Sequence, residues 1–248
     1  MTDQIRLDRD DAVATITLDR PDALNAITPT MLDALGEILA ECAVDGTRVV
    51  VLTGEGRAFS AGVDLKALGE AKPKDGEVGG GLNTPARRVT GLLSTMPAIT
   101  VAKVNGYCFT GALELALACD LIVAADEAVF ADTHAKFGLR PTWGMSQRLP
   151  QLIGVVAARE MSYTARRIDG VEAKALGLAA RTAPLAELDA AVDALITELV
   201  DNSAGSLAAY KDLYQQAIER PLADGLTYEY STDYIIPDTA DRLGGFGS

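Results

Sequence analysis

The chain has 248 residues, of which 48% are hydrophobic and 23% charged, a composition typical of one globular domain or of a domain with a helical appendage. Its formal net charge of −13 at pH 7 argues against nucleic acid as a partner, because a nucleic-acid-binding surface needs an excess of cations. No apolar run approaches the ~20 residues that cross a membrane, and the first residues lack the pattern of a signal peptide, so we expect a cytoplasmic protein without a membrane partner.

The cysteines and the single histidine limit which metals or cofactors the chain could hold. Cys42, Cys108 and Cys119 are an odd number without the spacing of metal ligands, and we expect them to be buried free thiols in a reducing compartment. One histidine and scattered thiols give no ligand set, so we expect no metal and no tightly bound cofactor. No glycine-rich run of the kind that cradles nucleotide phosphates opens a helix, which argues against nucleotide hydrolysis and dinucleotide redox chemistry.

The first part of the chain alternates strands and helices. Residues 5–18 alternate apolar and polar side chains around Asp10 and Asp11, which predicts a β-hairpin. Thr28 and Pro29 open an amphipathic helix that we expect to reach about residue 43, and residues 49–52 form a short buried strand. Residues 72–81 are the most loop-like segment, and such segments often act as mobile lids near a site.

The rest of the chain continues this order and then becomes mainly helical. We expect, in turn, a helix over 85–94, a strand over 99–104, a helix over 111–119, and strands over 121–124 and 129–131. From Gly144 onward the pattern is mainly helical. The order predicts an α/β core over residues 1–195 and a C-terminal helical region over 196–248.

The stretch from Asn105 to Asp120 is the most informative in the chain. A turn of small residues ends an apolar strand, and a helix starts at once with Glu114 on an otherwise apolar first turn. Unpaired backbone N–H groups at a helix N-terminus suit a developing anion. The pattern therefore indicates an oxyanion site with an acid/base group beside it.

A second segment, Ala58 to Lys66, also runs from a strand through small residues into a helical start. If the two turns face each other, the N–H of Val63 and the N–H of Gly111 converge on one carbonyl oxygen, as a thioester enolate requires. Either turn alone is a weak signal and is more typical of a tight strand-to-helix junction.

With these two segments in this order, the sequence resembles the crotonase family, the enoyl-CoA hydratases and isomerases. The similarity is carried by residues 20–21 and 24–26, 58–66, 104–120, Pro141 with residues 147–149, and the helical segment over 152–178. The resemblance implies a spiral of ββα turns with a C-terminal helical trimerisation region, and trimers that often pair as hexamers. It also implies a coenzyme A thioester whose oxygen is held by the N–H groups of Val63 and Gly111. The remaining substrate and CoA contacts that it implies are Leu24, Ala26, Ala61, Asp64, Leu65, Lys66, Thr142 and Trp143.

The second catalytic position departs from the family pattern. Glu114 matches the first of the two glutamates of a family hydratase, but the position of the second is occupied by His134, the only histidine in the chain. A neutral imidazole can take a proton and an imidazolium can give one, so Glu114 and His134 form a candidate acid/base pair for adding water. A solitary histidine in a loop is also often structural, and Asp132 is a rival carboxylate two residues away.

A further departure concerns the residues after Pro141. Thr142 stands where most hydratases of the family have a glycine whose backbone lies near the reacting water. Trp143 is the only tryptophan in the chain. Its bulk either shapes the acyl pocket or packs as core, and the sequence leaves both open.

The leading hypothesis is therefore hydration of a 2-enoyl-CoA, with coenzyme A as part of the substrate and a homotrimer or dimer of trimers as the assembly. The same oxyanion hole also supports other chemistry. Glu114 alone could shift a double bond, as in an isomerase, and His134 as a base could serve a C–C hydrolase. The third hypothesis is a protein that binds acyl-CoA without turning it over.

Overall fold

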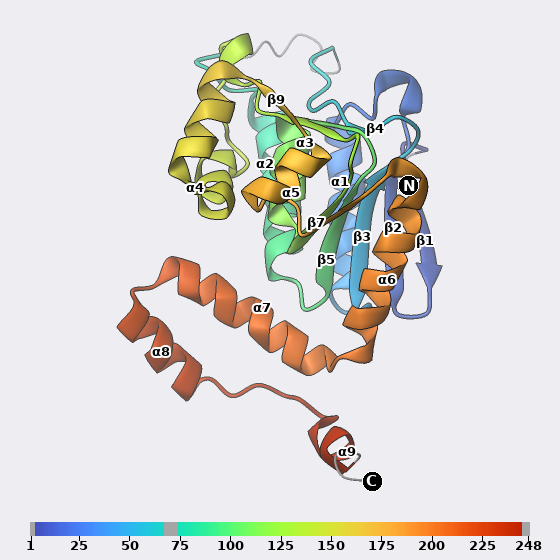
Figure 1. Ribbon diagram of the computed structural model, residues 1–248, viewed down its shortest axis with the longest axis vertical. Helices are drawn as coiled ribbons and strands as arrows, with labels where there is room; N and C mark the ends of the chain where they lie inside the picture. Colours follow the sequence, from blue (N-terminus) through green and yellow to red (C-terminus); the bar gives the residue numbers. More distant parts are fainter. Residues whose placement is uncertain (1–2, 67–73, 245–248) are drawn as a thin grey trace.

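Two sheets form the core of the computed structural model, which describes residues 3–66 and 74–244 (Figure 1). Within these residues, the larger sheet has the order β1-β2-β3-β5-β7-β10, and its strands are β1 (Ile5–Asp10), β2 (Val13–Leu18), β3 (Val49–Gly54), β5 (Ile99–Val104), β7 (Leu121–Ala125) and β10 (Arg181–Ala183). The smaller sheet has the order β4-β6-β8-β9, and its strands are β4 (Ala58–Ser60), β6 (Tyr107–Phe109), β8 (Val129–Ala131) and β9 (Arg167–Asp169).

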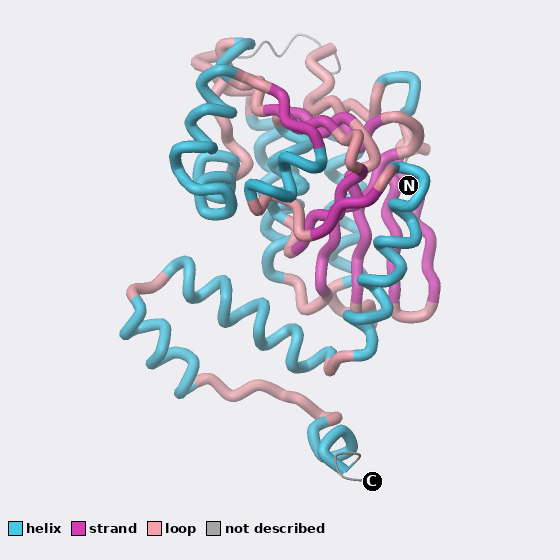
Figure 2. The backbone as a smooth tube through the Cα atoms, viewed as in Figure 1, coloured by secondary structure: helices cyan, strands magenta, loops and turns pink. Residues whose placement is uncertain are grey.

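Helices cover the sheets and form the C-terminal part of the chain (Figure 2). They are α1 (Pro29–Cys42), α2 (Gly80–Thr95), α3 (Gly111–Ala118), α4 (Met145–Thr164), α5 (Gly170–Leu176), α6 (Leu188–Asp201), α7 (Ala204–Glu219), α8 (Leu222–Ser231) and α9 (Thr239–Gly244).

The chain winds through the two sheets as a spiral. Each turn adds one strand to the larger sheet, one strand to the smaller sheet and then a helix: β3-β4-α2, β5-β6-α3 and β7-β8-α4. The successive strands β3, β5 and β7 pair in parallel, and so do β4, β6 and β8. This arrangement confirms the predicted α/β spiral of ββα turns.

Local sequence signals explain the first elements. The predicted hairpin is confirmed: β1 and β2 pair from Ile5 with Leu18 to Asp10 with Val13, and Asp11 turns the chain with a φ of 48°. Helix α1 starts where Thr28 accepts a hydrogen bond from the N–H of Met31, which satisfies one of the unpaired donors of the first turn.

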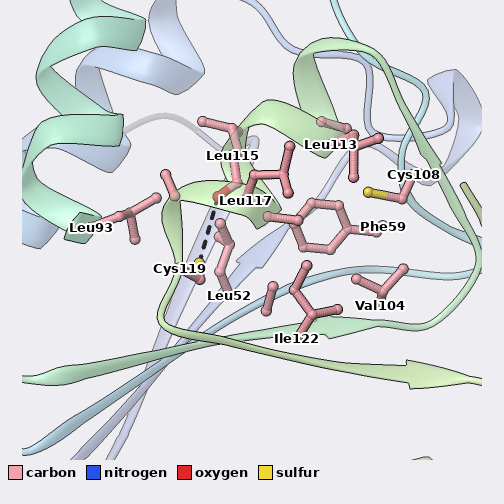
Figure 3. Packing of buried hydrophobic residues seen from close by; sticks show 14 of the residues in the cluster. Leu52, Phe59, Leu93, Val104, Cys108, Leu113, Leu115, Leu117, Cys119 and Ile122 are labelled. Atoms are coloured by element: carbon pink, nitrogen blue, oxygen red, sulfur yellow. Dashed lines mark hydrogen bonds between the residues drawn. The ribbon is translucent and has the colours of Figure 1, made fainter. Parts of the chain in front are cut away.

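Helix α3 is buried on every side, and this fixes the position of its first turn (Figure 3). Its leucines pack against Phe59 and against apolar side chains of β3, β5 and β7, including Leu52, Val104 and Ile122. Burying one such side chain contributes about 1.5–3 kcal/mol. This packing therefore holds the N-terminus of α3 in a fixed position.

Helix α2 begins at Gly80, five residues earlier than its sequence suggests. Pro85 therefore lies inside the helix. Helix α2 packs against α1 and α3, and Leu82 and Ala86 are fully buried. This burial outweighs the poor helix propensity of the glycines. Of the segment expected to be a loop, residues 80 and 81 are helical, and residues 72 and 73 lie outside the described residues.

Two short strands interrupt the predominantly helical second half. Strands β9 and β10 have three residues each, and both add an edge to a sheet: β9 pairs with β8, and β10 pairs with β7. Only Ile168 is buried in β9, which is too short a pattern for periodicity to reveal.

Helices α7, α8 and α9 form a layer apart from the core (Figure 1). Helix α6 packs against β10, β7 and the neighbouring strands, and the predicted boundary near residue 195 falls inside it. Helix α7 is joined to the core by Lys211, which is buried and donates hydrogen bonds to the carbonyl oxygens of Leu93 and Ala98 and to the Asp120 carboxylate.

The three cysteines are free and buried, as the sequence predicts. In the part of the chain that the structure describes, no helix is long and apolar enough to cross a membrane.

Candidate active site

The two turns with matching sequence patterns lie against each other. Gly62 has a φ of +92°, and a Cβ there would lie 2.8 Å from the carbonyl oxygen of Phe109 and 3.6 Å from the nitrogen of Gly111. Neither Val63 nor Gly111 donates a backbone hydrogen bond within residues 3–66 and 74–244. Two unpaired N–H groups therefore stand at one place in the fold, where a ligand oxygen could accept from both.

A frame of hydrogen bonds holds the turn that contains Gly62 and Val63. The N–H of Ala61 donates to the carbonyl oxygen of Leu24 over 2.9 Å. The Arg20 guanidinium donates to the carbonyl oxygen of Ala26 over 2.6 Å and to the Asp64 carboxylate over 3.1 Å. These interactions fix the turn from behind, because Leu24, Ala26 and Asp64 do not line the pocket in front of it.

Lys66 lies beyond this frame, with its backbone N–H donating to the Asp64 carboxylate, and it too stands outside the pocket. For Leu24, Ala26, Asp64 and Lys66, contact with the CoA part of a substrate stays a prediction.

A pocket of about 170 Å³ opens in front of the two N–H groups. Among the predicted site residues, the structure brings together Val63, Gly111, Glu114, His134, Ala61, Leu65, Thr142 and Trp143 in its wall. Sequence reasoning did not find the other lining residues, which are Val78, Thr110, Thr133, Phe137, Leu139 and Arg140.

Glu114 projects into this pocket from the first turn of α3 and is only 1% exposed. Its Oε1 accepts hydrogen bonds from the backbone N–H groups of Trp143 at 2.9 Å and Met145 at 3.0 Å. Burial raises the pKa of the Glu114 carboxyl, and these two donors and His134 offset only part of the shift. A carboxyl of this kind holds its proton more firmly than an exposed one, which suits a general acid.

His134 lies next to Glu114 in the pocket wall, with 3.6 Å between Nε2 and Oε2. Its other ring nitrogen, Nδ1, lies 2.7 Å from Oδ1 of Asp132. Asp132 is buried behind the histidine and is not part of the pocket wall. The structure therefore places Asp132 against His134 and away from the cavity.

Trp143 both packs as core and shapes the pocket. It is 3% exposed, and its ring covers Gly111 so closely that a Cβ on Gly111 would lie 2.7 Å from the ring. Its Nε1–H donates to Oδ1 of Asn83, which also accepts from the hydroxyl of Thr142. Trp143 therefore does both of the things that the sequence leaves open: it packs in the core and it shapes the pocket.

A sequence model described as "Enoyl-CoA hydratase/isomerase" matches residues 8–246. The chain belongs to the enoyl-CoA hydratase/isomerase family. A carnitinyl-CoA dehydratase from Citrobacter koseri is 38% identical over 182 residues, which cover 73% of this chain and 68% of that protein.

Solved structures of the family share the whole fold. An enoyl-CoA hydratase from Bacillus anthracis superposes with a TM-score of 0.90 at 31% identity, covering 98% of this chain and 95% of that one. A Thermobifida fusca chain solved in complex with acetoacetyl-CoA gives a TM-score of 0.83 at 34% identity, covering 97% and 95%. These matches confirm the predicted family and fold.

In this family member, two residues that sequence reasoning missed hold the wall of the pocket. Asn83 of α2 is buried and bonds both Thr142 and Trp143. Arg148 of α4 donates to the carbonyl oxygen of Trp143 and to the Ser94 hydroxyl. Both side chains make contacts far along the chain, so no local spacing could have indicated their roles.

The segment before α2 closes one side of the pocket. The backbone N–H of Arg140 donates to the carbonyl oxygen of Gly76 over 2.8 Å, and the Arg140 guanidinium pairs with the Glu77 carboxylate. Val78 contributes to the pocket wall. This placement is compatible with the predicted lid, whose opening stays a prediction.

Across residues 3–66 and 74–244, no group of three His, Cys, Asp or Glu side chains is arranged to hold a metal ion.

Proposed function

We propose that this protein adds water across the double bond of a 2-enoyl-CoA thioester, with Glu114 and His134 as its acid/base pair. One observation carries the proposal. The facing atoms of Glu114 and His134 are 3.6 Å apart, in the same pocket wall as the unpaired N–H groups of Val63 and Gly111.

The oxyanion hole would supply the driving force. When the thioester oxygen accepts hydrogen bonds from Val63 and Gly111, electron density leaves the conjugated double bond and its β-carbon becomes electrophilic. Water adds there, and the enolate oxygen that forms is held by the same two donors. One such donor is worth about 100- to 1000-fold in rate.

The two side chains would divide the proton transfers. His134 Nε2 takes a proton from the attacking water, and Glu114 gives its proton to the α-carbon. The raised pKa of this carboxyl increases the fraction that carries a proton to give. The product is a 3-hydroxyacyl-CoA. After this step His134 carries an additional proton and Glu114 lacks one. Transfer of one proton from Nε2 of His134 to Oε2 of Glu114 returns both side chains to their starting states.

The substrate class is supported by relatives. The Thermobifida fusca neighbour was solved with acetoacetyl-CoA, and the Citrobacter koseri relative is named a carnitinyl-CoA dehydratase. Coenzyme A would therefore enter as part of the substrate and leave as part of the product. The buried free thiols fit a reducing compartment, and we propose the cytoplasm.

We also propose that the chain works as a homotrimer, or a dimer of trimers, assembled through its C-terminal helices. Several large apolar side chains on α7 and α8 are exposed in the single chain, among them Tyr210, Tyr214, Leu222 and Tyr230. Such a concentration of exposed apolar side chains is typical of an interaction surface.

A second candidate function is hydrolysis of a carbon–carbon bond next to a carbonyl group. The contact between His134 and Asp132 favours it, because a histidine backed by a carboxylate also activates water for attack on a carbonyl carbon.

Turnover of crotonyl-CoA tests the first proposal. The purified chain should remove the absorbance of the conjugated enoyl group, and a His134→Ala variant should lose about 100- to 10,000-fold in kcat. Parallel assays with a 3-enoyl-CoA and a 1,3-diketone identify the isomerase and the C–C hydrolase. Binding of acyl-CoA by calorimetry without any product identifies a binding protein. Absence of hydration across several chain lengths would rule out the proposal.

A further inference from the structure

We infer that Asp132 is a positioning residue that keeps a proton on Nδ1 of His134 and thereby leaves Nε2 available to act on the substrate. This inference rests on the proposed role of His134, although its first test does not depend on turnover.

The contacts of Asp132 fix where the protons lie. Its Oδ1 faces Nδ1 of His134 at 2.7 Å and also accepts from the backbone N–H of His134 at 3.2 Å. Its Oδ2 accepts from the hydroxyl of Ser162 in α4 at 2.7 Å. An ionised carboxylate can only accept hydrogen bonds, so the short contact with His134 requires a proton on Nδ1.

The ionised state of Asp132 follows from these same donors. Burial by itself would raise the pKa of the Asp132 carboxyl, but the hydrogen bonds from His134 and Ser162 outweigh burial, and its pKa lies below the ordinary value. Asp132 does not line the pocket, so it cannot act by touching a substrate there.

The consequence appears at the other ring nitrogen. A neutral imidazole with its proton on Nδ1 carries a lone pair on Nε2, and Nε2 is the atom that faces Oε2 of Glu114 at 3.6 Å. Oε1 of Glu114 already accepts two backbone hydrogen bonds. The side of the pair that faces the pocket therefore holds one mobile proton, which Oε2 and Nε2 can exchange.

This arrangement also accounts for the charge of the site. Two glutamates that share one proton carry a net charge of −1. Asp132, His134 and Glu114 carry the same charge when Asp132 is ionised and one proton is shared between the other two. A histidine at the second position thus needs the buried carboxylate behind it to keep both the charge and the number of mobile protons.

The first experiment reads the tautomer directly. His134 is the only histidine in the chain, so long-range ¹H–¹⁵N correlation spectra of the ¹⁵N-labelled full chain contain a single imidazole. We expect its Nδ1 to carry a proton. An unprotonated Nδ1 with a proton on Nε2 would overturn the inference. Because this measurement needs no substrate, its outcome is independent of whether the chain hydrates an enoyl-CoA.

The second experiment compares two variants at the same carboxylate. Asp132→Asn removes the charge and should shift the ring toward the tautomer protonated on Nε2. We expect kcat on crotonyl-CoA to fall about 100- to 10,000-fold with KM within a few fold of wild type, as when the aspartate of a catalytic triad is replaced by asparagine. Ser162→Ala keeps the charge and removes only the hydrogen bond at Oδ2, so kcat should change by a few fold and Nδ1 should keep its proton.

In Asp132→Asn, the tautomer of His134 and the kcat must change together. If Asp132→Asn keeps the wild-type tautomer, or turns over with a wild-type kcat, Asp132 does not position His134. If Asp132→Asn does not fold, the wild-type spectrum still decides the question, because a proton on Nδ1 supports the inference and an unprotonated Nδ1 overturns it.

Discussion

Glu114 shows at the level of a single residue how the site combines stability and chemistry. Two backbone N–H groups hold one of its oxygens, and burial raises the pKa of the carboxyl. The folded protein therefore favours the neutral acid more than the unfolded chain does. Ionisation of this residue at neutral pH opposes folding, which is a common cost of an active-site carboxyl.

Replacing Glu114 with glutamine should make the protein more stable and much less active. The pKa of Glu114 is higher in the folded state than in the unfolded chain, so the carboxyl destabilises the fold at neutral pH, and this cost disappears as the pH falls below the unfolded value. Glutamine keeps an oxygen to accept the same two hydrogen bonds. Urea unfolding should show a higher free energy of unfolding than wild type at pH 7 and no gain near pH 4, with kcat about 100- to 10,000-fold lower.

Asp132→Asn is the matched control for that experiment because its effect on the free energy of unfolding should have the opposite sign. The pKa of Asp132 is lowered in the folded state, so its charge stabilises the fold above the unfolded pKa and the benefit is lost on acidification. The variant should be less stable than wild type at pH 7, and the difference should shrink only as the pH falls below the unfolded value of about 3.8 toward the lower folded-state pKa. A stability gain for Asp132→Asn at pH 7, or a loss for Glu114→Gln, would contradict the assigned charge states.

At the level of elements, α7 depends on one buried cation. The ammonium group of Lys211 bonds two carbonyl oxygens and the Asp120 carboxylate. Asp120 in turn accepts from the N–H and the hydroxyl of Thr100 in β5. Lys211 therefore connects the C-terminal layer to the sheet.

Lys211→Met should loosen α7 from the core. The substitution removes the hydrogen bonds to the carbonyl oxygens of Leu93 and Ala98 and the ion pair with the partly exposed Asp120 carboxylate, which should cost about 1–3 kcal/mol. Amide hydrogen exchange should accelerate in α7, and limited proteolysis should release the C-terminal helices first. Lys136→Met, at an exposed position between β8 and α4, is the control and should change stability by about 0.5 kcal/mol or less. Equal protection of α7 in both variants would show that the helix is held by other contacts.

For the whole molecule, the exposed apolar side chains of α7 and α8 determine the assembly that we propose. Light scattering of the wild-type chain should give three or six times the 26.0 kDa of one chain. A Tyr214→Glu/Tyr230→Glu double variant should reduce this mass, because both side chains are largely exposed in the single chain and would each bury a charge in the interface. Val44→Glu, at an exposed site after α1, should leave it unchanged. A monomeric wild type would contradict the proposal.

Much of this molecule follows from local patterns. The hairpin, the buried strand and the two turns with Val63 and Gly111 each depend on signals within a few residues, and the resemblance placed them in one family fold. The spiral of ββα turns is confirmed by the parallel pairing of β3, β5 and β7.

What the sequence could not indicate depends on packing between distant segments. Asp132 lies two residues from His134, yet only the structure shows that it bonds Nδ1 and that Ser162 holds its other oxygen. Asn83 and Arg148 support the pocket wall through partners more than fifty residues away in some cases. Helix α2 starts early because its buried face overrides a glycine-rich beginning.

The central claim is that this site adds water to the acyl chain of a CoA thioester, and oxygen-18 water tests it most directly. After incubation with crotonyl-CoA in this solvent, mass spectrometry of the intact thioester should show one ¹⁸O atom in the acyl chain. Glu114→Gln should incorporate far less in the same time. An intact thioester without ¹⁸O, or ¹⁸O only in a free acid with coenzyme A released, would contradict the account.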